Sequence, residues 1–157
     1  MEDELMAGIR PFAAPEPAAL KALETLHLRC VDVLAGFETM VGRAEPEFRA
    51  TAERFRDLHR AQAQELAEMI ARFGREPEID GSLMSTVNRA VVSMRSLING
   101  IDGSILDQIQ DGEQHVVDAF DDALGVGQPI DVTARLRSMR RELCLLLFET
   151  QAAATGR

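Results

Sequence analysis

Residues 18–41, AALKALETLHLRCVDVLAGFETMV, decide the fold class of this 157-residue chain. Apolar side chains recur in this stretch at steps of three and four residues, at Leu20, Leu23, Cys30, Leu34, Phe37 and Val41. Because an α-helix turns by about 100° per residue, this spacing places them along one side of a helix. The sequence therefore predicts an amphipathic helix that buries one face.

The same spacing recurs four more times along the chain. The expected helices cover residues 46–73, 82–98, 105–124 and 131–150, and glycines, prolines or an Asn-Gly turn separate them. No stretch alternates polar and apolar residues as a half-buried strand would. We therefore predict one all-α domain over residues 18–153, an antiparallel helix bundle with an extra helix between two hairpins. Residues 1–17, with three prolines and no sustained period, are expected to form a flexible tail.

Composition excludes several classes of partner. The chain has 17 Lys and Arg against 26 Asp and Glu, so its formal charge of −9 leaves no basic stripe for nucleic acid. It contains no apolar run of membrane-spanning length, and acidic Glu2, Asp3 and Glu4 stand where a signal peptide would be basic. We expect a soluble, cytoplasmic protein that binds neither nucleic acid nor membranes. In that compartment Cys30 and Cys144 are expected to remain free thiols that pack as small hydrophobic residues.

Four polar residues fall on the predicted apolar faces. His27 lies on the first helix, His59 and Gln62 on the second, and Glu113 on the helix at 105–124. Counting residues from the turn near Ala44 places His27 at about the level of His59 and Gln62. A buried carboxylate is costly unless it is paired, hydrogen-bonded or bound to metal, so Glu113 needs a partner such as a histidine or a cation.

Two interpretations of these residues are open. Each one can be an ordinary core or interface residue, with Glu113 paired to an arginine or a histidine. Alternatively, Glu113, His59 and His27 can form a metal site, for which iron is the first candidate because di-iron proteins use the same architecture.

The ligand pattern of di-iron bundles tests the second interpretation. Those proteins use one Glu from each of two helices and a Glu-x-x-His pair from each of the other two. This chain has one such pair, Glu24 with His27, and its last helix contains no histidine, so a six-ligand set is not visible. Three further acids flank the stripes, and each is either an additional ligand or a solvated rim residue: Glu38, Glu65 and Glu142.

Other chemistries have weaker support. The sequence lacks paired-Cys zinc motifs, a Gly-rich phosphate loop and a nucleophile elbow. His115 should project from the outer side of its helix, as a phosphotransfer histidine would. Its neighbours do not supply the nearby Lys and Gly that such domains use.

Three stretches resemble a bacterial family of ferritin-like four-helix-bundle proteins of unknown function. They are ELAEMIARFGREPE (65–78) with the Gly-Ser-Leu that follows at 81–83, QDGEQHVVDAFDDAL (110–124) and, more weakly, DVLAGFE (32–38). The similarity spans about residues 20–150, and the glycine turn and the Gly-Glu-x6-Phe spacing are not generic to helix bundles. The resemblance implies a ferritin-like fold and descent from iron-binding bundles, without implying a demonstrated reaction.

The resemblance also assigns individual residues. Glu113 matches the family's acid after glycine, Glu65 its glutamate on the second helix and Asp32 its acid on the first helix. Ala35 stands where relatives often have Glu, and RRELCLLLFE (140–149) stands where they often carry a His. These departures favour a structural or stress-related protein with a degenerate metal site, and the alternative is an iron-binding oxidase or storage protein.

The last helix is apolar around its whole circumference from Leu143 to Phe148. One buried face cannot cover all of these residues, so Cys144, Leu145 and Phe148 must point away from the core stripe. A helix of this kind is usually enclosed on both sides, here by the extra helix or by another subunit. We predict a homodimer whose two-fold interface includes the last helix.

Overall fold

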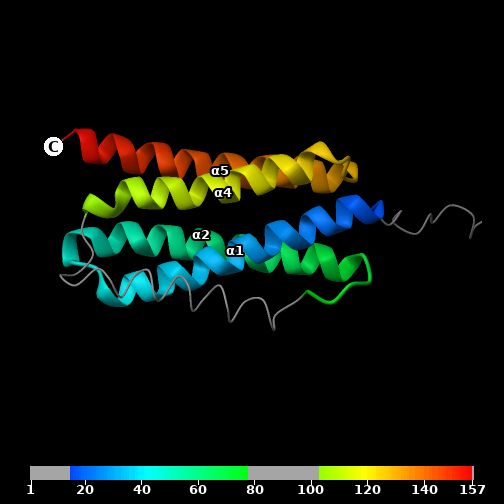
Figure 1. Ribbon diagram of the computed structural model, residues 1–157, viewed down its shortest axis with the longest axis horizontal. Helices are drawn as coiled ribbons and strands as arrows, with labels where there is room; N and C mark the ends of the chain where they lie inside the picture. Colours follow the sequence, from blue (N-terminus) through cyan, green and yellow to red (C-terminus); the bar gives the residue numbers. More distant parts are fainter. Residues whose placement is uncertain (1–14, 78–102, 157) are drawn as a thin grey trace, which may run out of the picture.

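The computed structural model describes residues 15–77 and 103–156, and these ranges are helical with no β-strand. The helices are α1 (Pro17–Arg43), α2 (Pro46–Arg72), α4 (Leu106–Gly125) and α5 (Ile130–Thr155), with a short 3-10 helix, Gly103–Ile105, leading into α4 (Figure 1). The all-α prediction is confirmed, and the predicted helix ends lie within a few residues of those observed. The helix expected at 82–98 and most of the tail expected at 1–17 lie outside the described residues.

Prolines and glycines set the helix ends. Pro17 and Pro46 are the first residues of α1 and α2, where a missing amide hydrogen costs nothing and the fixed φ suits the helix. Gly74 follows α2 with a φ of 81°, and Gly127 lies in the turn between α4 and α5 with a φ of 76°. Residues with a side chain rarely adopt this left-handed conformation, so both turns favour glycine.

The helices form a four-cornered bundle in which α1 and α5 each pack against both α2 and α4. Polar contacts show that α5 runs antiparallel to both α2 and α4. The contacts between α2 and α5 join Arg54 to Glu149 and Arg72 to Asp131. Those between α4 and α5 join Asp121 to Arg140 and Gln110 to Gln151. Consequently α2 and α4 run parallel and lie diagonally across the bundle. The end of α2 and the start of α4 therefore lie at opposite ends of the bundle (Figure 1).

The buried stripes match the prediction closely on α2 and α5 and less well on α1. Ala19, Leu26 and Met40 are buried on α1, whereas Leu20 and Leu34, which were expected in the core, are only half-buried. The stripe is shifted because a strict seven-residue spacing drifts around a helix of 3.6 residues per turn. In addition, α1 packs between two neighbours, so the centre of its buried arc lies between α2 and α4.

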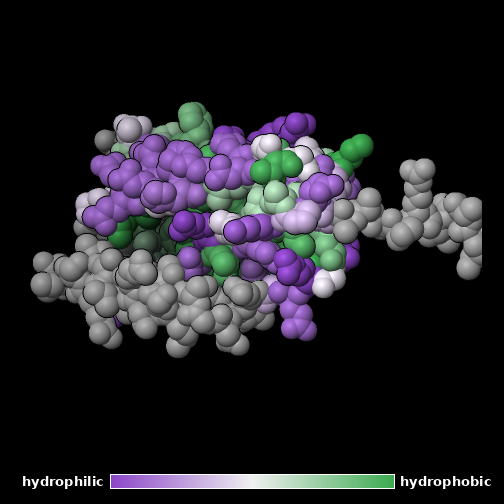
Figure 2. Space-filling model, turned by 45° about the vertical axis from the view of Figure 1, so that its right-hand side comes forward, coloured by the Kyte–Doolittle hydropathy of each residue, from purple (hydrophilic) through white to green (hydrophobic). Residues whose placement is uncertain are grey.

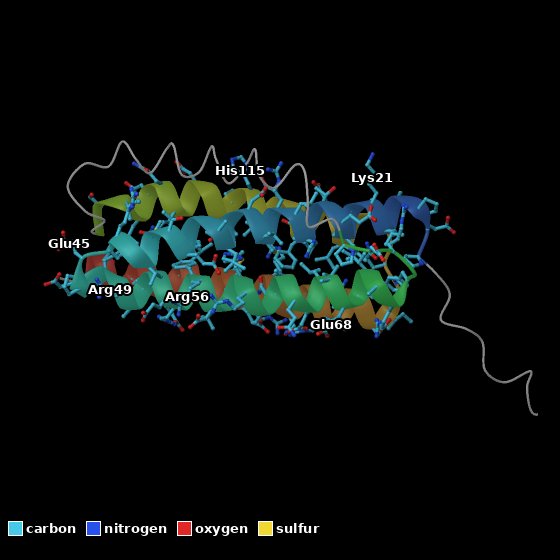
Figure 3. The ribbon with its side chains drawn as sticks, turned by 90° about the horizontal axis from the view of Figure 1, so that it is seen from below. Lys21, Glu45, Arg49, Arg56, Glu68 and His115 are labelled. Atoms are coloured by element: carbon cyan, nitrogen blue, oxygen red, sulfur yellow. The ribbon has the colours of Figure 1, made fainter. Side chains whose placement is uncertain are left out.

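Polar side chains cover most of the outside. The face shown in Figure 2 is largely hydrophilic, with scattered hydrophobic residues. Lys21 and His115 point away from the bundle (Figure 3), as the sequence predicted for His115. Among the helices of the described ranges, none combines the length and apolar content needed to cross a bilayer.

Candidate functional site

A histidine and a glutamate meet in the centre of the bundle. His59 Nε2 and Glu113 Oε1 lie 2.8 Å apart and share a hydrogen bond, and the two side chains are 0% and 1% exposed. His59 belongs to α2 and Glu113 to α4, so the bond crosses the core diagonally. The prediction that Glu113 would need a partner such as a histidine is confirmed.

Aromatic packing holds the imidazole in place. The His59 ring stacks on Phe37 of α1 with centroids 5.8 Å apart and an interplanar angle of 14°. Phe37 in turn stacks on Phe55, one turn before His59 on α2, at 5.0 Å. These contacts fix the plane of the imidazole. The hydrogen bond to Glu113 selects the ring orientation that presents Nε2.

Several buried polar atoms around His59 and Glu113 have no hydrogen-bond partner in the described part of the chain. They include Glu113 Oε2 and His59 Nδ1, together with Oε1 of Gln62. The Gln62 amide donates to the backbone oxygen of Met139 at 3.0 Å, which ties α2 to α5. Buried polar atoms without partners are uncommon in native proteins, and three of those in the described residues lie in this layer.

The thiol of Cys30 is close enough to be affected by this layer. Burial raises the pKa of Cys30, and the negative charge of Glu113 raises it further. Because the thiolate is the nucleophilic form, Cys30 stays a protonated, inert thiol at neutral pH. Both cysteines are free, as expected, and Cys144 is half-buried on α5.

His27 is buried at a different level of the bundle. Its ring borders a pocket of about 330 Å³ that is also lined by Lys21, Glu24, Ile70 and Arg75. Burial lowers the pKa of His27, which favours the neutral imidazole. His27 lies ten residues from Phe37, the α1 residue that stacks on His59, and ten residues of helix span about 15 Å.

The expectation that His27 shares a level with His59 and Gln62 is therefore not met. It was based on counting residues from the turn near Ala44, which treats side chains as perpendicular to the helix. Helical side chains lean toward the N-terminus of their own helix, so contacting residues of an antiparallel pair are not equally far from the turn. The contact between Phe37 and His59 shows this offset, because Phe37 is much nearer the turn in sequence.

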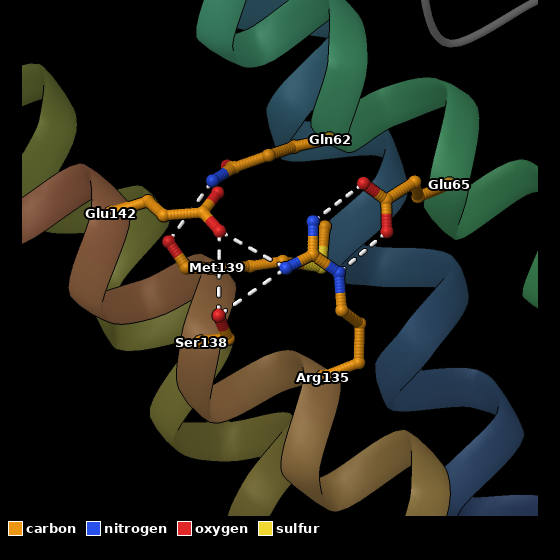
Figure 4. Close-up of polar contacts among 6 residues, drawn as sticks. All are labelled: Gln62, Glu65, Arg135, Ser138, Met139 and Glu142. Carbon is orange, nitrogen blue, oxygen red and sulfur yellow. Dashed lines mark hydrogen bonds and ion pairs between the residues drawn. The ribbon is translucent and has the colours of Figure 1, made fainter.

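The other predicted metal ligands lie against arginines. Glu24 Oε1 is 3.4 Å from Arg75 Nε. Arg135 of α5 donates to both carboxylate oxygens of Glu65 at 2.6 Å and to Glu142 at 3.0 Å (Figure 4). The hydrogen bonds from Arg135 lower the pKa of Glu65, which keeps this carboxylate ionised.

Arg135 is not among the residues that the sequence pattern singled out. Its guanidinium joins α2 to α5 and also contacts Ser138 at 3.3 Å. A signal was present, because Arg135 and Glu142 are seven residues apart and so lie on the same side of α5, next to the buried stripe through Leu136. Its partner on α2 could not be read from the spacing within one helix.

The described residues do not fit a di-iron centre. Within residues 15–77 and 103–156, no three His, Cys, Asp or Glu side chains come together in a way that could hold a metal ion. The buried side chains of His59 and Glu113 are hydrogen-bonded to each other, and the carboxylates of Glu24 and Glu65 face arginines. Asp32, which matches the family's acid on the first helix, is half-buried, and burial raises its pKa while the charge of Arg29 opposes that shift.

Comparison with known protein families matches residues 18–125 to one family, described as a domain of unknown function (DUF2383). The matched segment covers more than half of the chain and includes α1, α2 and α4, whereas α5 lies beyond it. No curated protein and no solved structure matches the chain. The His59 and Glu113 layer thus lies inside the matched region, and the chain belongs to the DUF2383 family of proteins of unknown function.

Proposed function

We propose that this protein is a ferritin-like bundle with a structural or stress-related role in the cytoplasm and a degenerate metal site. Its topology supports the ferritin-like part of the proposal. Two antiparallel hairpins are joined so that α2 and α4 run parallel, and ferritin-like folds use one such long crossover within a four-helix bundle.

The observation that carries the proposal is the pairing of the candidate ligands with the protein's own side chains. Glu113 is bonded to His59, Glu65 to Arg135 and Glu24 lies near Arg75. A carboxylate inside a bundle needs a positive or hydrogen-bonding partner, and in a di-iron protein the metal supplies it. Here protein groups fill that need, so the fold has no requirement for a metal ion.

The alternative function is an iron-binding oxidase or storage protein that uses Glu113, His59 and His27. Unpartnered buried atoms favour it, namely Glu113 Oε2 and one ring nitrogen, Nδ1, of each histidine. It requires a rearrangement, because His27 lies at another level and His59 presents Nε2 to Glu113 rather than to a shared centre.

Elemental analysis separates the two functions. The protein would be expressed in iron-replete medium and purified without chelator, alongside Glu113→Ala and a control, Asp122→Ala, which removes an exposed acid from the same helix. We expect iron far below one atom per chain in all three proteins, and a melting temperature unchanged by chelator. Iron near one atom per chain that is lost only in Glu113→Ala would establish the alternative.

We also propose that the protein is a homodimer that docks through α5 and binds no nucleic acid. Leu145 and Phe148 are 54% and 71% exposed on this helix, and they are among the large hydrophobic residues that the described bundle leaves uncovered. The net charge of −9 supports the absence of a nucleic-acid partner. Sedimentation analysis at several concentrations tests the dimer, and a monomer at all of them would rule it out.

A further inference from the structure

The side of α5 that faces away from the core carries a second regular stripe. Its residues follow one another at steps of three and four, and all are exposed: Ile130, Ala134, Arg137, Arg141, Leu145, Phe148 and Ala152. The exposed residues of α4 are of another kind, and most are acidic or amide side chains, such as Asp107, Asp111, Gln114, Asp118 and Asp122. Five of the seven stripe residues are apolar, and apolar residues at this spacing on an exposed face are the pattern of a helix that packs along a second helix outside its own bundle.

We infer that a second copy of this chain docks antiparallel on this stripe, with the two-fold axis between Leu145 and Phe148. This inference rests on the proposed homodimer and goes beyond it by fixing the direction and register of the two helices. A two-fold interface brings the same surface together from both copies. In this register Leu145 packs on the partner's Phe148, and Phe148 packs on the partner's Leu145.

Charge supports the antiparallel direction. Neither Arg137 nor Arg141 has an ion pair in the described part of the chain, and α5 has no basic residue in its own last turn. In the antiparallel register Arg141 lies beside the partner's Ala152, and Arg137 lies beside the partner's Gly156. Two arginines thus approach the C-terminal end of the partner's α5, where the helix dipole and the free carbonyl groups attract cations.

The parallel direction places like charges together. Two copies in parallel register would bring Arg141 against the partner's Arg141 and repeat the repulsion at Arg137. In the antiparallel register Arg141 and its copy are separated by eleven residues of helix, which is about 16 Å. That distance is about twice the screening length of about 8 Å in physiological salt, so their repulsion is largely removed.

Cysteine cross-linking reads the register directly. Leu145→Cys and Phe148→Cys would be made with different affinity tags in a Cys144→Ser background, co-expressed and mildly oxidised, and the products separated by mass. The antiparallel register predicts that cross-links between the two variants exceed cross-links within either variant by tenfold or more. A 1:2:1 statistical mixture, or an excess of same-variant products, would overturn the register.

A charge substitution gives an independent test with a matched control. Phe148→Glu should raise the dimer dissociation constant at least tenfold in sedimentation experiments. Ile130→Glu should leave it within twofold, because Ile130 lies on the same stripe and is 91% exposed but falls outside the paired segment. Equal effects of the two substitutions would refute the register and keep the dimer, whereas a monomeric parent protein would refute the dimer as well.

Discussion

Glu113 and His59 stabilise the core only as a pair. Glu113→Ala leaves a buried imidazole without its partner and opens a cavity, so we expect it to lower the free energy of unfolding by about 3–5 kcal/mol. Chemical denaturation at pH 7 measures this loss. If Glu113→Ala left the free energy of unfolding unchanged, the pair would contribute nothing to the stability of the fold.

Replacing both partners removes the unpartnered imidazole and the cavity that together destabilise Glu113→Ala. His59→Phe combined with Glu113→Leu fills the layer with apolar side chains of similar size, and Phe at position 59 keeps the stacking on Phe37. We expect the double variant to recover most of the stability lost in Glu113→Ala, because an apolar replacement of a buried pair is often neutral or stabilising. A double variant less stable than Glu113→Ala would show that the polar pair itself is required for folding.

His27 should make stability fall in mild acid. Burial lowers its pKa, so the folded protein holds it neutral, whereas the unfolded chain takes up a proton near pH 6.5. The contribution of neutral His27 to the free energy of unfolding is therefore complete above about pH 6.5. Below that pH it declines by at most about 1.4 kcal/mol per pH unit. The free energy of unfolding of His27→Leu should change less between pH 7 and pH 5 than that of the parent. His115→Leu, at an exposed position, should reproduce the parent slope.

At the scale of the elements, Arg135 links α2 to α5. Arg135→Met keeps the aliphatic stem and removes the hydrogen bonds to Glu65 and Glu142, which are partly exposed. We expect a loss of about 1 kcal/mol at pH 7 because solvent screens such pairs. The lowered pKa of Glu65 adds stability above its unfolded value of about 4.3, and this contribution is lost as the pH falls through the folded pKa.

The pH dependence distinguishes this ion pair from simple packing. The difference between the parent protein and Arg135→Met, measured by thermal unfolding, should shrink as the pH falls below about 4. Glu65→Gln should remove the same pH-dependent part without shortening the arginine. A difference that stays constant from pH 7 to pH 3 would assign the effect to packing alone.

Elements were easier to predict than contacts between them. Periodicity identified all four described helices and placed His59, Gln62 and Glu113 inside the core, because burial follows from spacing within one helix. The level of His27 was predicted wrongly, because it depends on how side chains lean where α1 meets α2. The contact of Arg135 with Glu65 was missed for a related reason, since it depends on how α2 and α5 are aligned.

At the scale of the whole molecule, self-association through α5 should make thermal stability depend on concentration. A dimer that forms only from folded chains stabilises them by mass action. The melting temperature of the parent protein should therefore rise when its concentration increases a hundredfold. The melting temperature of Phe148→Glu should rise less over the same range, because its dimer is weaker. A concentration-independent parent would contradict association through the exposed side of α5.

The parallel orientation of α2 and α4 also has a consequence for the order of folding. Each hairpin, α1 with α2 and α4 with α5, joins neighbours in sequence and can form rapidly, whereas bringing the hairpins together closes a long loop. If one hairpin docked end for end against the other, His59 and Glu113 would be stranded apart in a dry interior. Such a misassembled chain would have a higher free energy, because two buried polar groups would lack partners and the core would pack poorly. The hydrogen bond between His59 and Glu113 therefore favours the native arrangement of the two hairpins over the reversed one.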